Sequence, residues 1–184
     1  MLNNNLKKFL ENKIELIETN NFNQLYKDAQ TDLYFSQGIG TLTRALHKAG
    51  IDPLPHMEWI PFCYLYGDSN LTEYTIPDHI MFVESDAFAN CSLKKVVFGK
   101  RVDVVYYGAF EGCSQLSEVE LNDGLLEIGQ YAFRGTDLEK LRLPKSVRSI
   151  DVQAFPELLT LQVYHDTYAE SFAITNGYEV EYLD

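Results

Sequence analysis

The side chains of this chain that could do chemistry are few, and they do not form a recognisable catalytic motif. Cys91 and Cys113 are 22 residues apart and hold equivalent places in a repeated sequence pattern, in which Thr136 comes next. A metal site needs three or four convergent ligands, and no histidine is in step with the two thiols. We therefore interpret the two cysteines as small buried side chains that fill a turn. A metal or redox pair, or a disulfide between neighbouring repeats, is the alternative.

The first 66 residues offer the other candidates for catalysis. His56 and Cys63 are seven residues apart, with Trp59 between them, and this spacing is too loose for a zinc site. The segment Gly38-Ile39-Gly40 lacks the lysine and the third glycine of a phosphate-binding loop, so we predict an ordinary loop there. The sequence therefore predicts no catalytic residue, no metal and no cofactor. An enzyme with a site near His56, Trp59 and Cys63 is kept as an alternative.

The dipeptide Ala-Phe occurs four times, and its phenylalanines are 22, 23 and 22 residues apart. The four copies are Ala87-Phe88, Ala109-Phe110, Ala132-Phe133 and Ala154-Phe155. A fixed period in the twenties is typical of a solenoid, in which each unit covers the apolar face that its neighbour cannot bury alone.

A second pattern, Leu-x-x-apolar-x-apolar, runs in step with the dipeptide. Its five copies begin at Leu71, Leu93, Leu116, Leu138 and Leu158. The alternation at the end of each copy predicts a short strand with one face inward. Pairs of apolar residues three positions apart follow the strands and are also predicted to point inward: Ile80 and Val83, Val102 and Val105, Leu125 and Ile128, Val147 and Ile150. The pattern predicts about five stacked coils.

The two patterns together are specific enough to suggest a family. The phrase Ala-Phe-x-x-Cys-x-x-Leu-x-x-Val-x-Leu spans residues 109–121, and Leu-x-x-Ile-Gly-x-Tyr-Ala-Phe spans residues 125–133. Over residues 71–163 the sequence resembles the BspA-type leucine-rich repeats of bacteria, their phages and some protists. The resemblance implies a right-handed solenoid that binds other macromolecules, and it brings no catalytic residues.

Helices are predicted before and after the repeats. Apolar residues at helical spacing predict helices over residues 6–17 and 22–29, and a third is predicted over residues 41–49. The aromatic stretch at 59–66 is interpreted as a cap buried against the first coil. After the repeats, Thr167 and Glu170 fit a capping box, Gly177 ends the helix that they begin, and residues 178–183 read as a strand.

The predicted fold is therefore of the α+β class. We expect a helical N-terminal domain at residues 1–66, a right-handed leucine-rich-repeat β-solenoid at 67–164, and a helix–strand cap at 165–184.

The formal net charge of −12 bears on partners and compartment. Most of the excess lies in residues 71–184, which hold 19 acidic and 9 basic residues. Such acidity disfavours nucleic acid as a partner, and it favours a basic partner, solubility, or both. Charged residues interrupt every apolar run in the first twenty residues, so neither a signal peptide nor a membrane span is expected. Three cysteines do not make a disulfide framework, and a cytoplasmic protein is expected.

The outward strand positions are the main candidates for a binding surface. One column contains Glu73, Lys95, Glu118, Lys140 and Thr160, and the other contains Thr75, Val97, Glu120, Arg142 and Gln162. Charges alternate in sign along these columns, which is consistent with a self-satisfied ladder, with a partner-binding face, or with both. Tyr106 and Tyr107, near the second bend, are further candidates, with packing at the rim of the core as the favoured alternative.

The sequence as a whole predicts a non-catalytic protein-interaction module. The candidate partner-binding residues are Lys95, Val97, Glu118, Glu120, Lys140, Arg142, Tyr106 and Tyr107. One alternative is a phage- or prophage-encoded inhibitor of a host defence protein, acting in the host cytoplasm through an acidic surface. A surface adhesin is another.

Overall fold

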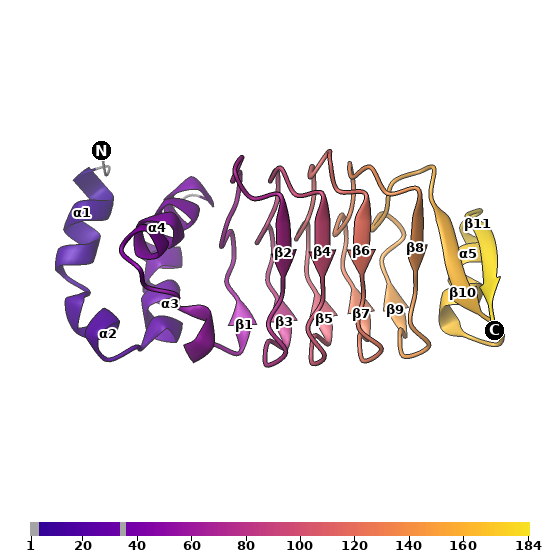
Figure 1. Cartoon of the computed structure of the whole chain (residues 1–184), viewed down its shortest axis with the longest axis horizontal. Coiled ribbons are helices and arrows are strands. Elements are labelled where there is room, and N and C mark those ends of the chain that lie inside the picture. The colour runs from indigo at the N-terminus through magenta and orange to yellow at the C-terminus, as the bar shows by residue number, and fades with distance from the viewer. Residues whose placement is uncertain (1–3, 34–35) are drawn as a thin grey trace.

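The chain forms a row of stacked coils with helices at both ends (Figure 1). The structure is a computed structural model that describes residues 4–33 and 36–184. The helices are α1 (Asn4–Glu11), α2 (Ile14–Glu18), α3 (Phe22–Asp32), α4 (Ser36–Lys48), the short 3₁₀-helix η1 (Leu54–His56) and α5 (Tyr168–Thr175). The strands are β1 (Trp59–Ile60), β2 (Glu73–Thr75), β3 (Phe82–Val83), β4 (Lys95–Val97), β5 (Val104–Val105), β6 (Glu118–Glu120), β7 (Glu127–Ile128), β8 (Lys140–Arg142), β9 (Ser149–Ile150), β10 (Thr160–Tyr164) and β11 (Glu179–Leu183).

Each coil contributes one strand to each of two sides of the solenoid. The strands β1, β3, β5, β7 and β9 form one five-stranded sheet, while β2-β4-β6 and β8-β10-β11 form two three-stranded sheets on the other side. Every strand pairing is parallel. This is the arrangement that a stack of equivalent coils produces, so the predicted β-solenoid is confirmed.

The Ala-Phe dipeptides form the third side of each coil. The amide N–H of Phe88 donates to the carbonyl of Ala109 at 2.8 Å, and the N–H of Phe110 donates in the same way to Ala132 at 2.8 Å. The phenylalanine rings stack inside the solenoid, with centroids 5.2 Å apart between Phe88 and Phe110 and 5.3 Å apart between Phe110 and Phe133. Backbone hydrogen bonds and ring stacking thus both join neighbouring coils along this side.

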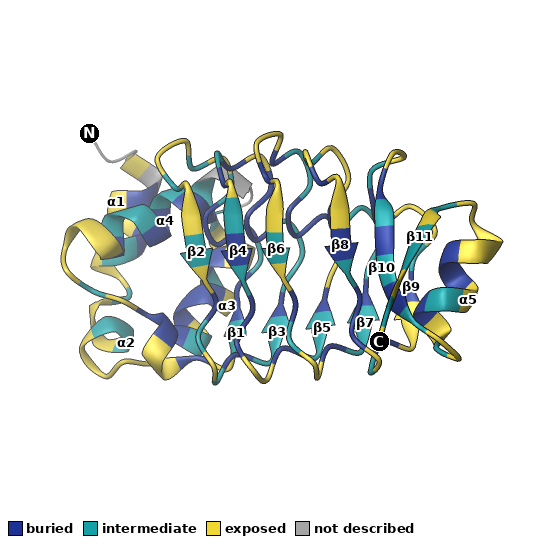
Figure 2. Ribbon diagram, turned by 45° about the vertical axis from the view of Figure 1, so that its right-hand side comes forward, coloured by how far each residue is buried: buried dark blue, intermediate teal, exposed yellow. Residues whose placement is uncertain are grey.

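The core follows the predicted inward positions with one exception. The apolar pairs after the strands are all buried, and Figure 2 shows that buried residues recur along the coils. Leu158, predicted to point inward, is instead 92% exposed, and Leu159 is buried in its place. The connection from Phe155 to β10 is shorter than the equivalent connections in earlier coils, and the inward position moves by one residue.

The predicted charge columns are not continuous. Glu73, Lys95 and Glu118 are in register on β2, β4 and β6, and Lys140 is in register with Thr160 on β10. Within the described residues, no strand pairing joins β6 to β8. The side-chain ladder follows the strand pairing and is therefore interrupted between β6 and β8, although Arg142 of β8 still pairs with Asp123 in the turn after β6.

The N-terminal helices differ from the prediction at two places. The predicted helix over residues 6–17 is divided into α1 and α2 at Asn12 and Lys13, where the ammonium of Lys13 pairs with Asp28 of α3 at 2.6 Å. The predicted loop at Gly38-Ile39-Gly40 is wrong, since these residues belong to α4. A Cβ at Gly40 would lie 3.2 Å from the carbonyl oxygen of Tyr66, so the missing side chain lets α4 approach the first coil.

The first coil of the solenoid begins within the aromatic stretch at residues 59–66. Trp59 and Ile60 of β1 pair in parallel with Phe82 and Val83 of β3. The next residues, Cys63 to Leu65, are buried and hydrogen-bond through their backbone to the turn that carries Ala87. A partial coil therefore precedes residue 67, where the repeats were expected to begin.

The C-terminal cap has the predicted order of helix and strand. The hydroxyl of Thr167 accepts from the N–H of Glu170 at 3.2 Å, and the carboxylate of Glu170 accepts from the N–H of Asp166 at 2.8 Å. Gly177 has the left-handed φ of 75° that follows a helix end, and β11 pairs in parallel with β10. Among the residues that the structure describes, no helix has the length and apolar character needed to cross a bilayer.

Candidate functional site

The strand face, formed by the outward side chains of β2, β4, β6, β8 and β10, holds most of the candidates from the sequence. The ammonium of Lys95 lies 2.6 Å from a carboxylate oxygen of Glu120 and 3.3 Å from one of Glu118. Val97 is half-buried between Thr75 and Glu120 in the sheet register. The hydrogen bonds that Lys95 donates to the carboxylates of Glu120 and Glu118 raise the pKa of Lys95. The single cation of β2, β4 and β6 is therefore already compensated, and the acids outnumber it.

The other part of the strand face is compensated in the same way. Lys140 lies 2.6 Å from Glu181 on β11, and Arg142 lies 2.5 Å from Asp123 in the turn after β6. Exposed ion pairs of this kind contribute little to stability because water screens them. They also leave few charges available to a partner, since each one would first have to break its existing pair.

The turn face is the surface over the Ala-Phe side of the coils, and we define it by Tyr107, Tyr131, Arg134, Val152 and Leu158. The rings of Tyr107 and Tyr131 meet edge to face with centroids 5.4 Å apart. The guanidinium of Arg134 lies 3.7 Å from the centre of the Tyr131 ring and is also paired with Glu111. Val152 and Leu158 are 64% and 92% exposed. Aromatic, arginine and apolar side chains are thus gathered on one exposed surface.

The two tyrosines predicted as candidates fall on different surfaces. Tyr107 is 44% exposed and belongs to the turn face. Tyr106 is 40% exposed and lies beside Phe82, with ring centroids 6.4 Å apart. Only Tyr107 is therefore next to the clefts described below.

In four successive coils of the turn face, two backbone positions have left-handed φ angles. The first position, just before each Ala-Phe pair or its equivalent, is held by Cys63, Asp86, Gly108 and Tyr131. The second is held by Gly67, Asn90, Gly112 and Gly135. Glycine suits such positions and asparagine tolerates them, but a bulky side chain at positive φ is unusual. Tyr131, with φ of 60°, therefore holds a strained conformation on the exposed face.

Two adjoining clefts open on the turn face. The first has a volume of about 480 Å³ and is lined by Tyr66, Asp86, Ala89, Asn90, Tyr107, Glu111, Gly112, Arg134 and Gly135. The second has a volume of about 630 Å³ and is lined by Tyr131, Arg134, Gly135, Val152, Gln153, Phe155, Pro156, Glu157, Leu158 and Tyr178. Arg134 and Gly135 line both, so the clefts are neighbours along the face.

The first cleft carries an unusual carboxylate. Asp86 is half-buried, and burial together with the nearby Glu111 carboxylate raises the pKa of Asp86 above its ordinary value. Among the described residues, no basic side chain forms an ion pair with Asp86. A negative charge without a partner therefore lines this cleft.

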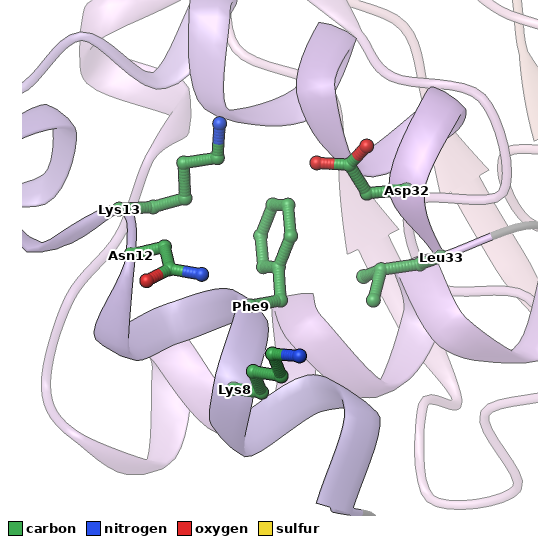
Figure 3. A pocket seen from close by; sticks show the side chains of 6 residues that line it. All are labelled: Lys8, Phe9, Asn12, Lys13, Asp32 and Leu33. Carbon is green, nitrogen blue, oxygen red and sulfur yellow. The ribbon is translucent and has the colours of Figure 1, made fainter.

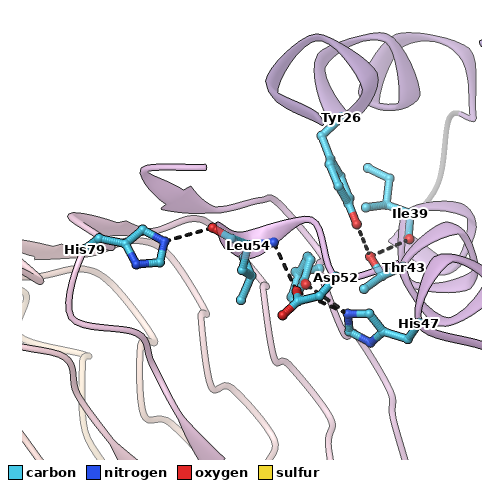
Figure 4. Close-up of polar contacts among 8 residues, drawn as sticks. Tyr26, Ile39, Thr43, His47, Asp52, Leu54 and His79 are labelled. Carbon is cyan, nitrogen blue, oxygen red and sulfur yellow. Dashed lines mark hydrogen bonds and ion pairs between the residues drawn. The ribbon is translucent and has the colours of Figure 1, made fainter. Parts of the chain in front are cut away.

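The N-terminal candidates for catalysis are not brought together around a site. His56 is exposed and packs against the ring of Phe22, with centroids 5.8 Å apart. Cys63 is fully buried, and burial raises the pKa of its thiol to about 12, so the thiolate is disfavoured at neutral pH. A different polar cluster lies at this end and was not predicted. In it, Nε2 of His47 lies 3.2 Å from the hydroxyl of Tyr64 and 4.0 Å from a carboxylate oxygen of Asp52 (Figure 4).

That polar cluster joins the helices to the first coil. The hydroxyls of Tyr26 and Thr43 are 2.8 Å apart, and Nε2 of His79 lies 2.8 Å from the carbonyl oxygen of Leu54 (Figure 4). Burial raises the pKa of Tyr64, so its phenol stays protonated at neutral pH. The contacts therefore serve to fix α3, α4 and η1 against the solenoid.

A separate pocket of about 420 Å³ opens among the N-terminal helices (Figure 3). It is lined by Lys8, Phe9, Asn12, Lys13, Asp32 and Leu33. The ammonium of Lys13 is paired with Asp28, and this hydrogen bond raises its pKa. The pocket offers a basic rim but no nucleophile with an adjacent base.

Cys91 and Cys113 are buried, as interpreted from the sequence. Their thiols lie 2.9 Å and 3.0 Å from the carbonyl oxygens of Leu65 and Phe88 in the preceding coils. No group of three or more possible metal ligands occurs among residues 4–33 and 36–184. Both thiols thus act as side chains that link one coil to the next.

Comparison with known proteins places the repeat pattern in a described family. The family model for the BspA type leucine rich repeat region matches residues 55–162 in six copies. No curated protein matches the chain.

Three solved structures resemble the chain. A leucine rich cell surface protein from Faecalibacterium prausnitzii A2-165 is 23% identical, with a TM-score of 0.51 over 61% of this chain and 32% of its own. A leucine rich repeat protein from T. pallidum is 26% identical, with a TM-score of 0.44 over 55% of this chain and 60% of its own. A leucine-rich repeat protein from Bacteroides ovatus is 22% identical, with a TM-score of 0.37 over 66% of this chain and 46% of its own. The chain thus spans about a third of the length of the F. prausnitzii protein, and this likeness shows the fold alone.

Proposed function

Because the chain belongs to the BspA-type leucine-rich repeat family, we propose that it is a protein-interaction module and that its partner binds to the turn face. The observation that carries the proposal is the exposure of Tyr107, Val152 and Leu158 beside two open clefts. Tyrosine and arginine contribute much of the binding energy at protein interfaces. A single exposed leucine is normal on a protein surface, but a contiguous group of exposed apolar side chains marks an interaction site. Here the exposed apolar side chains lie next to Tyr131 and Arg134.

The strand face is the weaker alternative for the same function. Its cations are already paired with Glu118, Glu120, Asp123 and Glu181 on the same molecule. A partner that bound there would replace these pairs with new ones of similar kind, and the net gain would be small. The turn face instead offers exposed apolar area at Val152 and Leu158, which a partner can cover without breaking an ion pair.

The rigidity of the solenoid supports this role. Except between β6 and β8, neighbouring coils are joined by backbone hydrogen bonds along the sheets and the Ala-Phe side, and the stacked phenylalanines join them inside. A surface held in one conformation before binding loses little conformational entropy when the partner arrives. Binding would therefore act by covering or scaffolding the partner.

The compartment distinguishes two versions of this proposal. In the first, the module acts in the cytoplasm, including the case of a phage-encoded inhibitor of a host protein; the three cysteines, free and buried in the structure, support this version. In the second, it is displayed at the cell surface, which the description of the F. prausnitzii protein supports. Fractionation of the native cells, with detection of the chain in each fraction, separates the two.

Affinity capture from the native host, read by mass spectrometry, tests the turn face. The test variant carries Tyr107→Ser and Leu158→Glu, which change exposed side chains and leave the core intact. The control variant carries Lys95→Gln and Glu120→Gln, which neutralise a matched pair on the strand face. We expect the wild type and the control to enrich the same protein and the test variant to lose it. Retention by the test variant, or loss by the control, would refute the assignment.

A further inference from the structure

The turn face already shows how this fold holds a guanidinium group. The central guanidinium carbon of Arg134 lies 3.7 Å from the centre of the Tyr131 ring, and the same group pairs with Glu111 of the preceding coil. An aromatic ring below and a carboxylate at the side are the two contacts that arginine makes best, because its planar group stacks and also donates hydrogen bonds. The arrangement joins two successive coils.

The first cleft, which Arg134 also lines, has the same two kinds of group, and its Asp86 carboxylate is not paired with that arginine. Tyr66 and Tyr107 line it, and the carboxylate of Asp86 lies between their coils. The ring of Tyr66 is held in place by its hydroxyl, which accepts a hydrogen bond from Asn90 at 3.0 Å. The cleft therefore offers aromatic rings and an acid in fixed positions.

Gly108 lets the carboxylate of Asp86 pack closely against the backbone of the next coil. A Cβ at this position would lie 2.6 Å from Oδ1 of Asp86 and 3.2 Å from Oε2 of Glu111. The hydrogen that glycine carries instead leaves room for the carboxylates of Asp86 and Glu111, both of which line the cleft. Glu111 is paired with Arg134, but Asp86 forms no ion pair with a basic side chain of the described chain.

The charge around the cleft is not compensated by the rest of the repeat region. Residues 71–184 hold 19 acidic against 9 basic residues, and Arg134 is the one basic residue among those that line the cleft. A half-buried carboxylate without a counter-ion is costly, and a cation brought by a partner removes that cost. Complementarity of charge therefore selects a basic partner at this point.

We infer that the cleft between Tyr66 and Tyr107 receives an arginine side chain of the partner protein, which pairs with Asp86 and stacks on a tyrosine as Arg134 does on Tyr131. This inference rests on the proposed function and makes it specific: the partner presents an exposed arginine next to an apolar segment that covers Val152 and Leu158. Arginine is favoured over lysine because only the guanidinium can stack and form two parallel hydrogen bonds to one carboxylate.

Nuclear magnetic resonance titration of the full chain with N-acetyl-arginine amide tests the inference. The neutral control is N-acetyl-citrulline amide, which has nearly the same shape and no charge. We expect saturable shifts of the backbone amides of Asn90, Gly108 and Gly112 at probe concentrations on the order of a few millimolar. We expect the citrulline probe to bind at least about tenfold more weakly.

Two variants test whether the arginine probe binds at Asp86. Asp86→Asn keeps the shape of the side chain and tolerates the left-handed backbone, so the fold is expected to persist while binding of the arginine probe falls about tenfold. Glu73→Gln removes one exposed acid from the strand face and should leave binding unchanged. Equal binding of both probes, equal binding by the Asp86→Asn variant, or loss in the Glu73→Gln variant would overturn the inference.

The outcome is separable from that of the capture experiment. If the turn-face variant loses its partner but the arginine probe does not bind at Asp86, the interaction module stands and the arginine subsite is wrong. If the probe binds at Asp86 but no captured protein depends on the turn face, the subsite stands and the proposed function is wrong.

Discussion

Replacement of Tyr131 by glycine should be less destabilising than its replacement by alanine, the reverse of the usual order. Tyr131 has a φ of 60°, and the equivalent residue one coil earlier is Gly108, with a φ of 57°. In this left-handed region the Cβ of any L-residue is close to the following carbonyl oxygen, whereas glycine has no Cβ. The Ala variant keeps the strain of the wild type and loses the ring; the Gly variant loses both.

The magnitude follows from the terms that differ between the two variants. Both lose the edge-to-face contact with Tyr107 and the stacking of Arg134, so these losses cancel in the comparison. Relief of left-handed strain favours glycine by about 1–2 kcal/mol, and the larger conformational entropy of glycine in the unfolded chain opposes it by about 0.5–1 kcal/mol. The Gly variant should therefore be more stable than the Ala variant by about 1 kcal/mol.

Urea denaturation followed by circular dichroism measures this difference. Val152 supplies the matched control, because it is exposed on the same face and its φ is not positive. At that position the ordinary order should hold, with alanine more stable than glycine by about 0.4–1 kcal/mol. If alanine is the more stable replacement at residue 131 as well, the coil does not impose a left-handed conformation there and the argument from strain fails.

Four further substitutions test the core, the register and the electrostatics. Phe110→Ala should cost about 3–5 kcal/mol of unfolding free energy in urea denaturation, because its buried ring stacks on rings in both neighbouring coils. Leu159→Ala should cost about 2–5 kcal/mol and Leu158→Ala less than about 0.5 kcal/mol, and equal effects would contradict the observed register. The pKa of Asp86 is raised in the folded state by burial and by Glu111, so the wild type loses stability as pH rises from about 4 through that raised pKa. Asp86→Asn should therefore raise the urea midpoint at neutral pH, and the gain should vanish below about pH 4.

The inward side of the solenoid was predictable because burial is periodic. Because the repeat length is nearly constant, every Ala-Phe pair lies in an equivalent turn and the apolar pairs after the strands lie at equivalent inward positions. The prediction failed at Leu158, where the coil before β10 is shorter and the period no longer applies. A repeat can therefore assign inward residues reliably only while successive coils have equal lengths.

The turn face was not predictable from the same pattern, although one signal was present. Aligned by the Ala-Phe pair, Asp86, Gly108 and Tyr131 share one column, and Gly108 marks that column as a position of positive φ. An aspartate and a tyrosine at positions equivalent to this glycine indicate that both side chains are held on a strained backbone. The continuity of the charge columns was also beyond the sequence, because it depends on whether β6 and β8 pair.

Backbone strain on the turn face and ion pairing on the strand face explain why the two faces differ in their capacity to bind a partner. The charges of the strand face lower one another's energy, so selection for stability alone would retain them. A tyrosine at positive φ and a half-buried aspartate without a cation both raise the energy of the folded chain, and glycine and asparagine would remove these costs at once. The presence of these two destabilising residues is explained if a bound partner makes the contacts that the isolated solenoid lacks. The turn face should therefore gain more on binding than the strand face, even though the strand face carries more charge.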